Sequence, residues 1–97
     1  MVDSKDFHAS LKAAKPPERL NRVQQALWWA GRRDWARAHE IVQKAEGTRD
    51  CDRVHAFLHR QEGDLSNARY WYRQADARMP DVSIQEEWTE LVRLYVR

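Results

Sequence analysis

The apolar residues of the chain recur at spacings of three and four, which is the periodicity of an amphipathic helix. The clearest case is the apolar stripe Ile84, Trp88, Leu91, Val92 and Tyr95. No segment alternates apolar and polar residues as a half-buried strand would. The pattern therefore predicts an all-α fold of about six helices, at roughly 4–14, 17–31, 34–47, 51–63, 64–79 and 83–95.

Capping residues and helix breakers predict where these helices begin and end. Three polar residues stand at expected N-caps: Asp34, Asp64 and Ser83. Three glycines stand at expected helix ends: Gly31, Gly47 and Gly63. Ser4 is expected to cap the first helix, and Pro16 to end it. Pro17 would then lie in the first turn of the second helix, and Glu86 would complete a capping box with Ser83.

Two segments of the chain are similar when they are compared at a shift of 30 residues. The segment RDWARAHEIVQKA, from Arg33, corresponds to GDLSNARYWYRQA, from Gly63. The identical pairs are Ala26/Ala56, Asp34/Asp64, Ala38/Ala68 and Ala45/Ala75. The small alanines would let two paired helices approach closely. We therefore expect one domain, 1–97, built on two helical hairpins at about 18–47 and 49–78.

Both units resemble tetratricopeptide (TPR) repeats, whose second helix begins with a Gly-Asp-Tyr-like turn followed by alanines and a large residue. The matching positions in the second unit are Gly63, Asp64, Leu65, Ala68, Tyr72, Ala75 and Pro80. Those in the first unit are Ala26, Trp29, Asp34, Trp35, Ala38, Val42 and Ala45. The period of 30 departs from the usual 34, and Arg33 stands where the turn glycine is expected. The stretch HAFLHRQEGDLSNARYWYRQA is also similar to a segment of small uncharacterised bacterial proteins, a resemblance that implies no activity.

The TPR resemblance implies a short array covered by N- and C-terminal capping helices, with a groove that binds a peptide or protein. The groove-facing positions that it implies are Arg53, Phe57, Arg60 and Gln61. Trp28 and Trp29 point about 100° apart on a helix, so we expect one of them at a groove or interface. We count Trp28 among the partner-binding residues, and exposed aromatics would also permit a homodimer.

Composition indicates which partners and which cellular compartment to expect. Charged residues make up 33% of the chain, and 17 basic residues are interspersed with 15 acidic ones for a net charge of +2. A nucleic-acid partner is therefore not expected. The longest apolar run, 26–30, is too short to cross a membrane, and the first residues lack the apolar core of a secretory signal. A lone cysteine, Cys51, favours a reducing cytoplasm.

The candidate chemistry lies on the fourth predicted helix, where His55, His59 and Glu62 fall along one side. Two histidines four residues apart can chelate a metal, with Glu62 as a third ligand. The other residues of this alternative ligand site are Asn67 and Tyr70, with Asp64 as outer support. A purely structural role for His59 stays open, because it corresponds to Trp29 in the other repeat unit. A hydrogen bond to Glu62, Tyr70 or Asp64 would satisfy a half-buried imidazole there. His8 and His39 have no ligand set nearby in the sequence.

These observations favour a small cytoplasmic interaction or scaffold protein without catalytic residues or a cofactor. The chain has no Gly-rich phosphate loop, no Ser-His-Asp order and no C-x-x-C pair. The alternative function is binding of a metal ion or a small polar ligand, with or without enzymatic activity, at His55, His59, Glu62 and Asn67.

Overall fold

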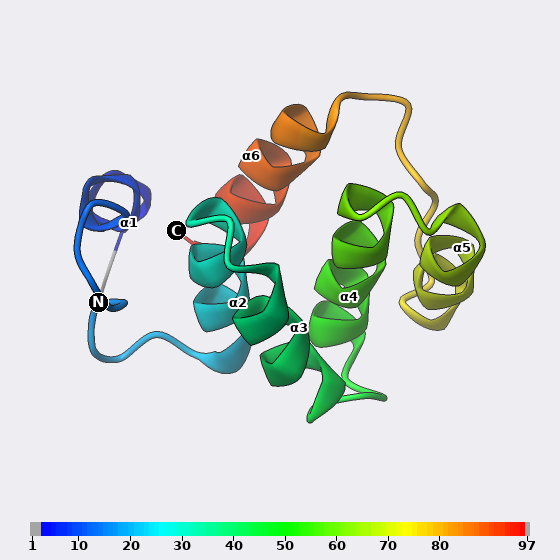
Figure 1. Ribbon diagram of the computed structural model, residues 1–97, viewed down its shortest axis with the longest axis horizontal. Coiled ribbons are helices and arrows are strands. Elements are labelled where there is room, and N and C mark those ends of the chain that lie inside the picture. The colour runs from blue at the N-terminus through cyan, green and yellow to red at the C-terminus, as the bar shows by residue number, and fades with distance from the viewer. Residues whose placement is uncertain (1–2, 97) are drawn as a thin grey trace.

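The computed structural model describes residues 3–96, and within that range the chain is all-α. The helices are α1 (Ser4–Ser10), α2 (Arg22–Gly31), α3 (Trp35–Gln43), α4 (Arg49–Gln61), α5 (Leu65–Gln74) and α6 (Ile84–Tyr95) (Figure 1). The all-α prediction with about six helices is thus confirmed. No helix in the described range has the length and apolar character needed to cross a bilayer.

Two helical hairpins, α2/α3 and α4/α5, have the same turn between their helices. The Asp34 N–H donates to the Trp29 carbonyl at 2.9 Å, and the Asp64 N–H donates to the His59 carbonyl at 2.9 Å. The residue before each aspartate is left-handed, with φ of 63° at Arg33 and 89° at Gly63. Both aspartates cap the following helix, as predicted, because their carboxylates accept backbone N–H bonds from its first turn.

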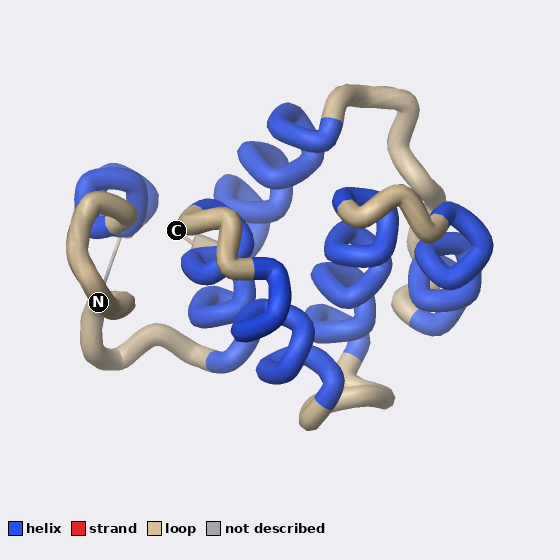
Figure 2. The backbone as a smooth tube through the Cα atoms, viewed as in Figure 1, coloured by secondary structure: helices blue, strands red, loops and turns tan. Residues whose placement is uncertain are grey.

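The N-terminal boundaries differ from the prediction. Asp3, and not Ser4, caps α1, and α1 ends at Ser10, well before the prolines. The Ser10 hydroxyl donates to the Phe7 carbonyl at 2.7 Å, a local side-chain bond of the kind that competes with further helix. Residues 11–21 then form one of the longer loops in Figure 2. α2 begins after Asn21, which forms a full capping box with Gln24, and so Pro17 does not start it.

The C-terminal helix packs against α2 and α4, the first helix of each hairpin (Figure 1). Ser83 caps α6 by accepting from the Glu86 N–H at 3.0 Å; the structure has only this half of the predicted capping box. Trp88 is buried, and its indole N–H donates to the Leu27 carbonyl at 2.9 Å. An ideal Cβ on Gly31 would lie 2.5 Å from the Trp88 ring, so the close approach of α2 and α6 depends on this glycine.

Candidate metal centre

Three imidazoles converge where α3 and α4 face each other. His39 comes from α3, whereas His55 and His59 lie one turn apart on α4. The Nε2 atoms of His39 and His55 are 3.2 Å apart. One ring nitrogen of each of the three residues lies within 4.8 Å of the others. His55 and His59 are only 2% and 6% exposed, while His39 is half-buried at the rim.

Glu62 fixes the orientation of one of these rings. Its Oε2 lies 2.5 Å from Nδ1 of His59, so the carboxylate accepts the Nδ1 proton. The lone pair of a neutral His59 is then on Nε2, the nitrogen that Glu62 does not use. A carboxylate that orients a ligating histidine in this way is the usual outer partner of protein metal sites. Asp64 adds a second carboxylate near His59 and Glu62.

Two indoles hold the other two imidazoles by stacking. Trp35 lies parallel to His39, with ring centroids 4.6 Å apart and planes 9° apart. Trp71, from α5, lies parallel to His55 at 4.0 Å and 15°. The Trp35 N–H donates to the Leu58 carbonyl at 2.7 Å, which fixes this indole in turn. The cluster is thus built by α3, α4 and α5 together, with its ring planes set before any ligand arrives.

Burial also sets the protonation of the cluster. Desolvation, followed by repulsion from His59 and His39, lowers the pKa of His55 to about 3. Desolvation likewise lowers the pKa of His39, with a further contribution from His59. Both rings are therefore neutral at pH 7, and one of the two facing Nε2 atoms donates its proton to the lone pair of the other. Burial of His55 also lowers the stability of the fold, because its Nδ1 has no hydrogen-bond partner in the described part of the chain.

The structure brings together only part of the predicted ligand set. His55, His59 and Glu62 lie side by side. The hydrogen bond between His59 and Glu62 fits both predicted roles, because a purely structural His59 would also need such a partner. Asn67 instead donates to Asp64 at 3.4 Å, within the cap of α5. Tyr70 is 46% exposed and contacts the edge of Trp71, beyond the imidazoles.

His39 is the residue that the sequence reasoning missed, and the view that it had no ligand set is wrong. A usable signal was present, because His39 and His55 lie at equal distances along the chain from Gly47. Two antiparallel helices joined by a short loop place such residues level with each other. Trp35 and His59 have the same relation to Gly47, and their rings are 5.9 Å apart.

The predicted partner-binding residues on α4 lie against α6, whereas Trp28 is covered by α1. Phe57 and Trp28 are fully buried, and the Trp28 N–H donates to the Ser10 hydroxyl of α1 at 3.0 Å. Arg53 and Arg60 bind the two carboxylate oxygens of the fully buried Glu87, at 2.7 and 2.8 Å. The α6 helix thus occupies the side of α4 on which a partner was expected.

Comparisons of the chain with protein-family models, with curated proteins and with solved structures found no match.

Proposed function

We propose that this protein binds a divalent transition-metal ion of the Zn²⁺ class through His39, His55 and His59. The observation that carries the proposal is the convergence of three nitrogen donors from two helices, with the Nε2 atoms of His39 and His55 only 3.2 Å apart. Glu62 supports it from outside by orienting His59.

The spacing fits tetrahedral coordination. Zn–N bonds of about 2.0–2.1 Å at tetrahedral angles separate two donor nitrogens by roughly 3.3 Å. The pair His39 and His55 already has this separation, at 3.2 Å. The third nitrogen lies within 4.8 Å of the others, so it needs a movement of at most about 1.5 Å, which a small change in side-chain torsions supplies.

The donor set also selects among metals. Imidazole nitrogens suit Zn²⁺, Cu²⁺ and Ni²⁺, whereas Mg²⁺ and Ca²⁺ prefer oxygen. A neutral histidine binds a metal without losing a proton from the ring, and the lowered pKa values of His39 and His55 keep both rings neutral. The ring that donates through Nε2 in the metal-free pair binds once its proton is on Nδ1. Three protein ligands leave a fourth position for water or another small ligand.

Calorimetric titration with Zn²⁺ tests the proposal, with His39→Gln as the site variant and His8→Gln as the matched control. His39 is half-buried at the rim, so its loss should not unfold the chain, and His8 is exposed on α1. We expect the wild type to bind one ion per chain. Loss of a ligand in His39→Gln should weaken binding by more than the tenfold to hundredfold that is typical when a residue hydrogen-bonded to a ligand is replaced. The His8→Gln variant should bind as the wild type does. Equal binding by His39→Gln and wild type would refute the site.

The interaction-protein function, the TPR likeness and the bacterial family resemblance stay predictions. A peptide that used Arg53, Phe57, Arg60 and Gln61 would have to displace α6, which pairs Glu87 with both arginines, and one that used Trp28 would have to displace α1. We rank metal binding first because its donors are already assembled. A cytoplasmic location also stays a prediction, which the single Cys51 supports.

A further inference from the structure

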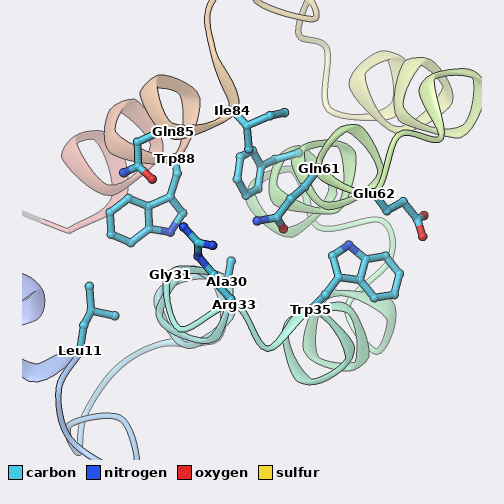
Figure 3. Close-up of a pocket in the computed structure, with 11 residues that line it drawn as sticks. Leu11, Ala30, Gly31, Arg33, Trp35, Gln61, Glu62, Ile84, Gln85 and Trp88 are labelled. Carbon is cyan, nitrogen blue, oxygen red and sulfur yellow. The ribbon is translucent and has the colours of Figure 1, made fainter.

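A second site of a different kind lies between α2, α4 and α6. It is a cavity of about 630 Å³, within the size range of small-molecule sites. Figure 3 shows its walls, with Trp88 of α6 on one side and Trp35 of α3 on the other. Arg33 and Gln61 extend into the space between them (Figure 3).

Arg33 supplies an exposed positive charge that has no ion-pair partner in the described part of the chain. The neighbouring Arg32 donates to the Leu11 carbonyl, and Arg53 and Arg60 are held by Glu87. Arg33 has no side-chain hydrogen bond or ion pair within residues 3–96. It also adopts the left-handed conformation, with φ of 63°, at the position where the matching turn has Gly63. The turn therefore holds a strained arginine at the cavity, where glycine would fit with less strain.

Gln61 supplies an unsatisfied amide in the same cavity. Its Oε1 is buried with no hydrogen-bond partner in the described chain, which is an unfavourable state for a polar atom. The last torsion of a glutamine is soft, so the amide can rotate to turn Oε1 toward the cavity. There its oxygen would accept a hydrogen bond from a ligand N–H or O–H group.

The remaining walls are apolar and aromatic. The indole N–H groups of Trp35 and Trp88 are already bonded to the Leu58 and Leu27 carbonyls, so these rings offer the cavity carbon surface. Phe57 and Ile84 continue this surface. Glu62 also borders the cavity, but its carboxylate is bonded to His59 and points away from the cavity in Figure 3.

We propose that this cavity binds a small organic carboxylate with an aromatic body and one hydrogen-bond donor. The Arg33 guanidinium would bind the carboxylate in a bidentate manner, which is the geometry that arginine favours. The aromatic body would lie between Trp35 and Trp88, and the donor would satisfy Gln61. Binding here does not require the proposed metal ion, although Trp35 and Glu62 border both sites.

Indole-3-acetate is a suitable probe because it carries all three features, and indole-3-acetamide is the same molecule without the charge. We would titrate each into isotope-labelled, EDTA-treated protein and follow the Trp35, Trp88 and Arg33 side-chain N–H signals by NMR. Removing metal separates the result from the zinc proposal. We expect saturable shifts with the acid and about tenfold weaker binding of the amide, as for loss of a charge-assisted bond.

Arg33→Gly is the decisive variant, and Arg69→Gln on α5 is its charge-matched control. Glycine relieves the left-handed strain, so the thermal midpoint should not fall while affinity for indole-3-acetate falls about tenfold or more. Arg69→Gln should bind as the wild type does. Equal binding of acid and amide, unchanged binding in Arg33→Gly, or no saturable shift at the cavity signals would each overturn the proposal.

Discussion

His39 and His55 face each other across the α3/α4 pair, with their Nε2 atoms 3.2 Å apart. Each ring is stacked on its own tryptophan, Trp35 in one case and Trp71 in the other. Two imidazoles at this distance share one proton or one metal ion between them, since two facing N–H groups would repel. The contact therefore couples the protonation of the cluster to whatever it binds.

Replacing Glu62 by glutamine should weaken zinc binding without unfolding the protein. The glutamine keeps the shape of the side chain but loses the charge that orients His59 through Nδ1. We expect affinity to fall by about tenfold to hundredfold. Because the Glu62 side chain is 37% exposed, the metal-free stability should change by less than about 1 kcal/mol. Calorimetry and urea unfolding measure the two effects.

Glu90→Gln on α6 is the matched control for this variant, because Glu90 is exposed and lies outside the cluster. It removes the same charge and should leave zinc affinity unchanged. If Glu62→Gln binds zinc as tightly as Glu90→Gln does, Glu62 does not orient a ligand.

The metal-free protein should lose stability as the pH falls below about 6.5. The unfolded chain protonates His55 near pH 6.5, whereas the folded chain does so only near pH 3. In that window the unfolded state binds more protons, so the free energy of unfolding rises with pH, by roughly 1.4 kcal/mol per pH unit for this group. The lowered pKa of His39 acts in the same direction. Urea unfolding in EDTA at several pH values measures the slope.

His55→Phe isolates the contribution of this ring. Phenylalanine keeps an aromatic face toward Trp71 and removes the buried, unpaired Nδ1. The slope between pH 6.5 and 4 should therefore decrease. A slope equal to that of the wild type, or a His55 ring that titrates near pH 6.5 by NMR, would contradict the predicted effect.

The helical pattern of this chain was predictable because its signals are local. Period, capping aspartates and turn glycines all act within a few residues, and Asp34 and Asp64 cap their helices as expected. The N-terminal boundaries were wrong where two local signals competed. Pro17 and Asn21 are both acceptable near a helix start, and only the mutual bonds of Asn21 and Gln24 decide between them.

The candidate site was predictable only on α4, because the rest of it depends on tertiary contacts. The i, i+4 spacing identified His55 and His59, but His39 joins them through the pairing of α3 with α4. Glu87 was missed for a related reason. A glutamate is expected to be exposed unless it is paired. The burial of Glu87 follows from its ion pairs with Arg53 and Arg60, which depend on the packing of α6 against α4.

Gly31→Ala should destabilise the protein even though alanine is the better helix former. The new Cβ would lie 2.5 Å from the Trp88 ring, so α6 has to shift. We expect a loss of about 1–3 kcal/mol, as for other overpacked sites, and a changed NMR signal of the Trp88 indole N–H. Gly63→Ala is the comparison, since its site is sterically open but has φ of 89°. Its cost of about 1–2 kcal/mol should come from backbone strain, with the Trp88 signal unchanged. An unperturbed Trp88 in Gly31→Ala would argue against this packing.

Glu87→Ala should strongly destabilise the packing of α6. The carboxylate is fully buried and binds Arg53, Arg60 and the hydroxyl of Tyr72, the last at 2.6 Å. Its removal leaves two nearly buried guanidinium groups without their anion, which typically costs about 3–5 kcal/mol. Urea unfolding measures the loss.

The cost should come from the uncompensated charges, and a triple variant tests that cause. Replacing Glu87, Arg53 and Arg60 together by leucine removes the ion pairs without leaving a charge behind. Such replacements are often close to neutral, so the triple variant should recover much of the stability that Glu87→Ala loses. If Glu87→Ala costs less than about 1 kcal/mol, the network does not hold α6 on α4. If the triple variant is less stable than Glu87→Ala, the ion pairs themselves, and not the stranded charges, stabilise this contact.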